Sequence, residues 1–191
     1  PGHKPRRCSP PHIWLSYVAM LSFDIRTLES TAAQVVGDLP ADDPIWSAVD
    51  PRPLEAVHVE GRFSSAGNGR FYFSGRFSGS VKLECRKCLT DVTRNVNEDA
   101  HFLFAPAGDP TTEGDPDVFT YDPGAHQIDV KPAVREGWLL SVPAFVECRE
   151  DCKGLCLTCG ADLNNGACNC EPVAADARWD SLRHARNDFH A

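Results

Sequence analysis

The sequence has no long hydrophobic run. A membrane-spanning helix needs roughly 18 apolar residues, and the nearest approach, residues 13–23, is interrupted by two serines. The chain also lacks a glycine-rich phosphate-binding loop before a helix, and it lacks a G-x-S-x-G motif, so it carries neither of these enzyme signatures. We therefore expect a non-enzymatic protein with no membrane partner and no small-molecule substrate.

Positive charge is scarce as well. The chain has 19 Lys and Arg residues against 27 Asp and Glu residues, a formal net charge of −8. A general nucleic-acid binder is expected to be basic, so any contact with nucleic acid must come from a local basic patch. Residues 105–125 contain no Lys or Arg. We expect them to form a solvated acidic loop, with residues 118–121 as a short edge strand.

Methionine occurs once, at Met20, and a strand-like run follows it directly. The first 19 residues are basic and then apolar, but they lack the small-residue cleavage site of a signal peptide. We therefore expect residues 1–19 to be a disordered extension and the protein to be cytoplasmic. In that compartment, clustered cysteines favour a bound metal over disulfides.

Proline and glycine are plentiful, and they favour strands, turns and irregular loops over long helices. Asn68-Gly69 predicts a tight turn between two strands, and Gly75 and Gly79 suggest bulges or strong twist. Residues 27–53 are expected to be an irregular excursion. Alternating polar and apolar residues predict strands at 21–25, 54–63, 70–77, 81–84, 91–104 and 127–130, and helical spacing predicts helices at 132–140 and 176–186.

These elements predict an α+β fold. It is a curled, barrel-like antiparallel sheet with one or two short helices, followed by a cysteine-rich segment. The expected domains are a β-rich domain at 20–147, which carries a hairpin with a C-x-x-C tip, and a zinc-binding segment with a terminal helix at 148–191.

Cysteine is the one unusually frequent residue. Of the chain's nine cysteines, six fall between Cys148 and Cys170. Cys156 and Cys159 are separated by two residues, which lets one tight turn direct both sulfurs to a single point. After an eight-residue gap come Cys168 and Cys170. Two close pairs on neighbouring loops are typical of a four-cysteine structural zinc site, so these four residues are predicted to bind one Zn²⁺.

A second zinc site is our working hypothesis. It would join Cys85 and Cys88, at the hairpin tip, to Cys148 and Cys152. Two alternatives remain open. In one, Cys156 and Cys159 share a site with Cys85 and Cys88; in the other, Cys148 and Cys152 are free or disulfide-bonded thiols. Cys8 receives no role.

A redox function is the enzymatic alternative. A reactive C-x-x-C cysteine needs a helix N-terminus to lower the pKa of its thiol. Cys85 is expected to lie between two strands, and Cys156 lies among other cysteines. Metal binding is therefore the favoured interpretation of both motifs.

Basic residues gather around the first C-x-x-C motif. They form a candidate RNA-binding surface whose phosphate contacts would be sensitive to salt, although a solvated face beside a structural zinc explains them equally simply. Phe71, Tyr72 and Phe73 would be able to stack on bases if exposed, but aromatic residues in a strand are usually part of a core. The candidate basic residues are Arg76, Lys82, Arg86, Lys87, Arg94, Arg149 and Lys153.

Several motifs together resemble a known family. They are Leu83-Glu-Cys-x-x-Cys-Leu89, Trp138-Leu-Leu-Ser-Val-Pro143, the whole cysteine segment from Cys148 to Cys170, and Ala177-Arg-Trp-x-x-Leu182. Over residues 20–188 they resemble the bacterial YceD family, known as the large ribosomal RNA subunit accumulation protein. The resemblance implies a non-enzymatic cytoplasmic factor that supports large-subunit (23S) ribosomal RNA by binding its precursor or an assembling ribosomal protein. A zinc-stabilised protein–protein adaptor without RNA contact is the second hypothesis, and a thiol redox protein is the third.

Overall fold

A computed structural model of the chain describes residues 21–171 and residue 178. Cys8, the predicted extension at 1–19 and the predicted helix at 176–186, apart from residue 178, lie outside the described part. Two compact units make up the chain, one containing residues 21–81 and 94–142 and the other containing residues 82–93 and 143–171. No helix among the described residues is long and apolar enough to cross a membrane.

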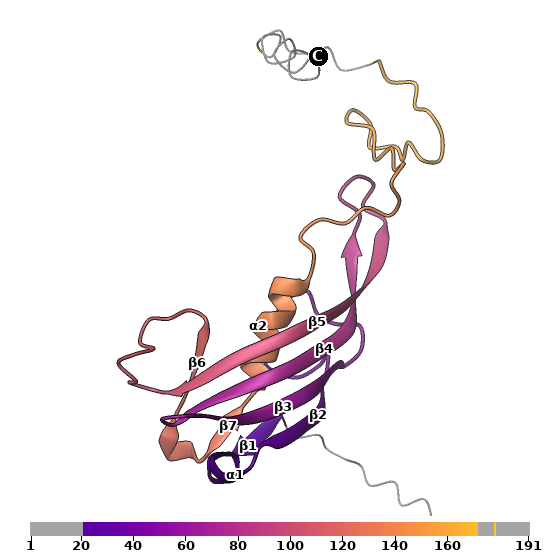
Figure 1. Cartoon of the computed structure of the whole chain (residues 1–191). Coiled ribbons are helices and arrows are strands. Elements are labelled where there is room, and N and C mark those ends of the chain that lie inside the picture. Colours follow the sequence, from indigo (N-terminus) through magenta and orange to yellow (C-terminus); the bar gives the residue numbers. More distant parts are fainter. Residues whose placement is uncertain (1–20, 172–177, 179–191) are drawn as a thin grey trace, which may run out of the picture. The chain divides into compact units, whose positions relative to one another are not determined.

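The first unit, here called the sheet unit, is built on a five-stranded sheet in the order β2-β3-β4-β5-β6 (Figure 1). β2 and β6 are its two edges, so the sheet is open and the described residues form no closed barrel. The predicted barrel-like curl is therefore not confirmed, whereas a mostly β fold with few helices is. The strands are β2 (Ala33–Leu39), β3 (Val57–Gly67), β4 (Arg70–Glu84), β5 (Asp91–Pro106) and β6 (Val118–Tyr121).

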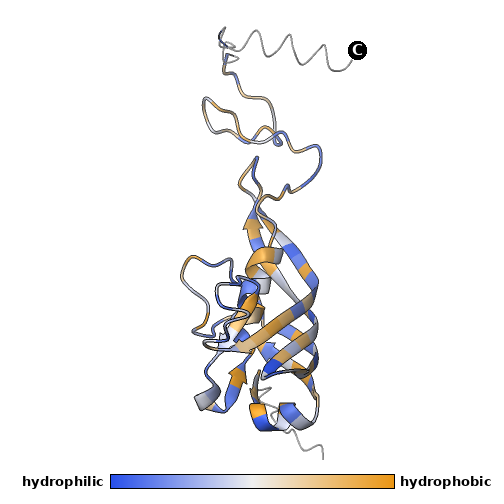
Figure 2. Cartoon of the chain, turned by 60° about the vertical axis from the view of Figure 1, so that its left-hand side comes forward, coloured by the Kyte–Doolittle hydropathy of each residue, from blue (hydrophilic) through white to orange (hydrophobic). Residues whose placement is uncertain are grey.

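Hydrophilic and hydrophobic residues alternate along these strands (Figure 2). This alternation gives the sheet one apolar and one polar face. On the apolar face Phe63 contacts the rings of Phe73 and Phe104 edge to face, and all three are almost completely buried. The α2 helix (Lys131–Ser141) packs on this face through Trp138, which lies against Gly79 of β4.

The sheet unit also contains a smaller, two-stranded sheet. It pairs β1 (Ser22–Asp24) with β7 (Gln127–Asp129) in antiparallel fashion. The short α1 helix (Ile25–Ser30) follows β1 directly and is capped by the side chain of Asp24. The 3-10 helix η1 (Pro123–Ala125) precedes β7.

Three features of the sheet unit differ from the sequence expectations. Residues 27–53 were expected to be irregular, but they contain the end of α1 and all of β2. The edge strand β6 is present but lies parallel to β5. The one register shift recorded between β3 and β4 lies at Ser65/Gly67, next to the Asn68-Gly69 turn, whereas Gly75 pairs directly with Gly61. A Cβ on Gly75 would lie 2.1 Å from the carbonyl oxygen of Glu60, so glycine is required there by close approach of the strands.

The second unit, here called the cysteine unit, includes the last residues of β4, the first residues of β5 and the turn between them. Residues 82–93 form the tip of the β4–β5 hairpin, and residues 143–171 form loops and turns with isolated bridges. One bridge joins Cys85 to Val146, and another joins Leu155 to Asp162. With so little regular structure, this unit depends on its side chains for cohesion.

Candidate metal centres

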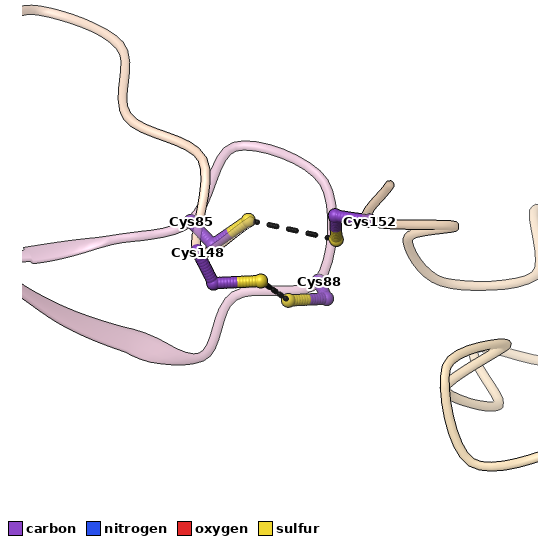
Figure 3. Close-up of side chains that lie close together, drawn as sticks. All are labelled: Cys85, Cys88, Cys148 and Cys152. Carbon is purple, nitrogen blue, oxygen red and sulfur yellow. Dashed lines mark hydrogen bonds between the residues drawn. The ribbon is translucent and has the colours of Figure 1, made fainter. Parts of the chain in front are cut away.

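The first group of cysteines, called the inner centre, combines Cys85 and Cys88 of the hairpin tip with Cys148 and Cys152. Their side chains point toward one another (Figure 3). Cys85, Cys88 and Cys152 are buried, and Cys148 is exposed. Val92 and Val146 are buried in the same apolar cluster, with Leu83 and Leu155 packed against it.

The sulfur positions of the inner centre fit a tetrahedral metal site. The Cys85 and Cys152 sulfurs are 3.9 Å apart, and the Cys88 and Cys148 sulfurs are 3.6 Å apart. Four thiolates each about 2.3 Å from a Zn²⁺ ion lie about 3.8 Å from one another. The two distances match this spacing, and all four sulfurs lie within 4.8 Å of one another.

The electrostatics of the inner centre also favour a cation. Burial works to raise the pKa of the Cys85 thiol, but the backbone amides of Cys148, Lys87 and Cys88 donate to its sulfur and lower the pKa to about 6. Burial together with the neighbouring sulfurs of Cys152 and Cys88 raises the pKa of Cys148 to about 12. Close thiols cannot all ionise without a counter-charge, and a divalent cation would supply one.

The second group, called the outer centre, contains Cys156, Cys159, Cys168 and Cys170. Cys159 is exposed and the other three are half-buried. Backbone amides of Cys159 and Thr158 lower the pKa of Cys156 to about 6, whereas hydrogen bonding with Cys159, together with burial, raises the pKa of Cys170 to about 12. In both centres the sulfurs lie within 4.8 Å of one another. The described residues thus provide two groups of four cysteines that can each hold a metal ion.

Each centre begins with a C-x-x-C turn of the same form. The Leu89 amide donates to the Cys85 carbonyl at 2.9 Å, and the Gly160 amide donates to the Cys156 carbonyl at 2.9 Å. Leu89 and Gly160 have φ values of 59° and 73°. Glycine adopts this left-handed conformation freely, whereas leucine does so at a cost. Neither Cys85 nor Cys156 lies at a helix N-terminus in the described structure, so the structure provides no helix to activate either thiol.

Asn164 connects the two centres. It lies in the loop between the two cysteine pairs of the outer centre, and its amide nitrogen is 3.6 Å from the Cys152 sulfur of the inner centre. Its side-chain oxygen accepts from the Lys153 amide at 2.9 Å and from Arg149 at 2.8 Å. Sequence reasoning missed Asn164, because its role depends on a turn that brings the outer loop against Cys152.

Glu147 is the second residue that sequence reasoning missed. One of its carboxylate oxygens accepts from Arg86, and the other accepts from Lys87 at 2.7 Å. Lys87 and Arg86 together hold the pKa of Glu147 below its ordinary value. Glu147 therefore fastens the segment before Cys148 to the hairpin tip.

The candidate RNA-binding cations lie among acidic partners. Lys82 pairs with Asp91 at 2.6 Å, Arg76 with Asp99 at 3.0 Å and Arg149 with Asp151 at 3.2 Å. Arg76 and Arg94 belong to the sheet unit, whereas the other candidates, including Lys153, belong to the cysteine unit. Contact with RNA by these residues stays a prediction.

Comparison with known proteins gives a family. The model of the family described as "Large ribosomal RNA subunit accumulation protein YceD" matches residues 73–184. The "Large ribosomal RNA subunit accumulation protein YCED homolog 1, chloroplastic" of Zea mays is 37% identical over 67 residues, which are 31% of this chain and 22% of that protein. Its counterpart in Arabidopsis thaliana is 31% identical over 73 residues, or 38% and 23% of the two chains.

A bacterial relative shares a longer region. An uncharacterized protein of Mycobacterium tuberculosis strain H37Rv is 36% identical over 116 residues, which are 57% of this chain and 52% of that protein. This chain thus spans about half the length of the mycobacterial relative and under a quarter of the plant relatives. No solved structure matches. Because the family match includes both candidate metal centres and more than half of the sequence, the chain belongs to the YceD family.

Proposed function

We propose that this protein is a non-enzymatic, cytoplasmic factor for accumulation of large-subunit ribosomal RNA, stabilised by two zinc ions. The observation that carries the proposal is the family match, whose residues contain all eight cysteines of the two centres. The protein would act by binding the RNA precursor or an assembling ribosomal protein.

Zinc is the metal that the donor set supports best. Four cysteine thiolates around one point are typical of structural zinc sites, in which no position remains open for a substrate. The inner centre would hold the tip of the β4–β5 hairpin against residues 143–152, and the outer centre would close the loop from Cys156 to Cys170. In both centres the metal would supply cohesion and no chemistry.

A protein–protein adaptor is the second candidate function. The observation that favours it is the neutralisation of the cations near the inner centre, because Arg86 and Lys87 both contact Glu147 and Lys82 contacts Asp91. Paired cations attract phosphate less strongly than free ones. Such an adaptor would make no contact with RNA.

Ultraviolet crosslinking of the tagged full chain in its native cells, followed by RNA sequencing, tests the proposal. We expect large-subunit ribosomal RNA to be enriched over its share of total RNA, and we expect depletion of the protein to lower mature large-subunit RNA relative to small-subunit RNA. The control is a tagged protein of similar abundance that does not bind RNA. Loss of large-subunit RNA on depletion without crosslinking enrichment would favour the adaptor, and no change in RNA on depletion would overturn the proposal. Metal analysis of the purified chain should find two zinc ions, and a single one would contradict the two-centre version.

A further inference from the structure

The polar face of the sheet unit is a second surface with recognition chemistry. The α2 helix packs on the apolar face, and outward side chains of neighbouring strands form rows on the opposite face. In one row Gln34 of β2 pairs with Arg62 of β3, which pairs with Ser74 of β4. In the next row Glu60 of β3 pairs with Arg76 of β4. The side chains named in these two rows are polar, and none of them is buried.

Two aromatic side chains form a flat platform on this face. The rings of Tyr72 and His101 are inclined by only 13°, and their centroids are 6.0 Å apart. At this separation, nearly parallel rings are displaced sideways rather than overlapping face to face. The Tyr72 hydroxyl lies 2.9 Å from Nδ1 of His101, so a hydrogen bond fixes the two rings relative to each other. Both side chains are exposed, Tyr72 by 39%.

An open hollow of about 390 Å³ lies beside the platform, and His101 is part of its wall. This volume is in the range of small-molecule binding sites. Its walls carry both hydrogen-bond donors and acceptors, as recognition of a base edge requires. The polar side chains that line it are Gln34, Glu60, Ser74, Arg76, Asp99 and His101.

The charges of the hollow suit a base better than a phosphate. The Arg76 guanidinium donates to Asp99 at 3.0 Å, and Glu60 lies opposite Arg76 in the strand register. Two carboxylates and one guanidinium therefore line the hollow, and the carboxylates would repel a phosphate group. Carboxylates accept well from the amino groups of bases, and a guanidinium donates to base carbonyl groups.

We propose that this hollow binds an unpaired nucleobase of single-stranded RNA, with the rings of Tyr72 and His101 as its stacking platform. The inference rests on the proposed role in ribosomal RNA accumulation and names a contact for it. Stacking on aromatic side chains is the usual means of holding unpaired RNA bases. Because few phosphates are neutralised in this contact, its affinity depends only weakly on salt.

The test measures binding of the full-length, metal-loaded chain to a fluorescently labelled single-stranded RNA by polarisation, at 50 and 200 mM salt. The RNA is a 12-nucleotide segment from a large-subunit precursor loop, and the same segment in duplex form is the comparison. Tyr72→Ala removes one ring of the platform, Tyr72→Phe keeps the ring without its hydroxyl, and His58→Ala is the matched control. His58 lies on the same face, where it pairs with Asp38, and is not part of the hollow.

We expect Tyr72→Ala to weaken binding of the single strand about 5- to 150-fold, the range of one lost base stack. Tyr72→Phe should retain most of the affinity, and His58→Ala should match the wild type. Thermal unfolding of each variant checks that the fold is intact. We expect it to be intact, because Tyr72 is exposed.

Three results would overturn the inference. If Tyr72→Ala binds the RNA as the wild type does, the hollow is not the site, although the role in RNA accumulation survives. If free nucleoside monophosphates compete as well as the oligonucleotide, the ligand is a small nucleotide and not RNA. The third result is that the wild type binds no RNA, and that a ribosomal protein binds the wild type but not the Tyr72→Ala variant. The surface would then be a protein-binding site. The proposed function itself fails only if depletion of the protein leaves ribosomal RNA unchanged.

Discussion

The two candidate metal centres share one donor set, four cysteines, in different surroundings. The inner centre takes two cysteines from a β-hairpin and two from a segment 60 residues later, and three of its cysteines are buried. The outer centre takes all four from one short loop, and none of its cysteines is fully buried. The donor set alone therefore does not determine what a centre stabilises. A metal in the inner centre would join distant parts of the chain, and one in the outer centre would close a single loop.

The two C-x-x-C turns differ in the same sense. The outer turn has Gly160 at its left-handed position, where a Cβ would contact no other atom. The inner turn has Leu89 at that position, exposed by 58% and held at a φ of 59°. Strain of this kind persists only where the surroundings determine the backbone. The burial around the inner centre provides such surroundings.

The largest effect is expected from Cys152→Ser. The variant should lose one zinc ion per chain, and the free energy of unfolding of the cysteine unit should fall by about 4 kcal/mol, as for loss of a structural metal. Zinc analysis and denaturant unfolding measure both quantities. Cys8→Ser, which changes a cysteine outside both centres, is the control. An unchanged zinc content in Cys152→Ser would remove the inner centre from the comparison.

As the pH falls, the candidate metal centres should lose stability at a higher pH than the sheet unit does. Protons compete with zinc for thiolates, so both centres should release their ions as the pH falls below about 6. Hydrogen bonds from Arg135, and then from Ser47, hold the pKa of Asp50 far below its ordinary value. Since the folded-state pKa is lowered, this contribution is fully present above the unfolded-state pKa of about 3.9 and is lost only as the pH falls through the folded-state value.

Asp50→Asn tests that difference. The Asp50 side chain is only 5% exposed and accepts from Arg135 at 2.7 Å, so the substitution should cost about 2 kcal/mol at pH 7. Its effect should shrink as the pH falls below about 4, because the Asp50 carboxyl of the unfolded chain then binds a proton while the folded carboxylate stays ionised to lower pH. Thermal unfolding of the sheet unit from pH 7 to pH 2 measures the difference. If the difference in stability between the wild type and Asp50→Asn were the same at every pH, the lowered pKa of Asp50 would be contradicted.

The strained turn should respond in the opposite sense to the relaxed one. Leu89→Gly removes a backbone cost of about 1–2 kcal/mol, partly offset by the extra freedom of glycine in the unfolded chain. It should therefore raise the stability of the cysteine unit by about 0.5 kcal/mol. Gly160→Ala should lower the stability of the outer loop by about 1 kcal/mol. Chelator-resistance of the two centres would report each change, and the same sign for both would show that the turns are not equivalent.

The smallest effect on the sheet unit is expected from Cys159→Ser. The variant should lose one zinc ion and loosen residues 156–170, while cooperative unfolding of the sheet unit changes by less than about 0.5 kcal/mol. Hydrogen exchange locates the change along the chain. If all cooperative unfolding disappeared, the outer centre would be as important to the fold as the inner one.

Patterns of neighbouring residues predicted the strands and turns of this structure better than they predicted contacts between distant parts of the chain. The run from residue 70 to 77 predicted the first part of β4, although the strand expected separately at 81–84 is the continuation of the same strand. The two-residue spacing of Cys156 and Cys159 predicted a turn with converging sulfurs. β2 was missed because Gly37 and the prolines from Pro40 onward outweighed the alternation of Val35 and Leu39.

The partners in the inner centre were harder to predict. Cys85 lies 67 residues from Cys152, and Arg86 lies 61 residues from Glu147. The exposure of Tyr72 between buried Phe71 and Phe73 is a consequence of strand geometry that the aromatic run alone did not reveal.

The separation between the halves of the inner centre has a consequence for protein synthesis. Cys85 and Cys88 leave the ribosome well before Cys148, and 60 residues separate Cys88 from Cys148. At about 5–20 residues per second, the first two thiols wait about 3–12 s for their partners. During that interval the nascent hairpin carries an incomplete site, whereas the outer centre is completed almost as soon as it is made. Zinc supply during translation should therefore affect the inner centre first.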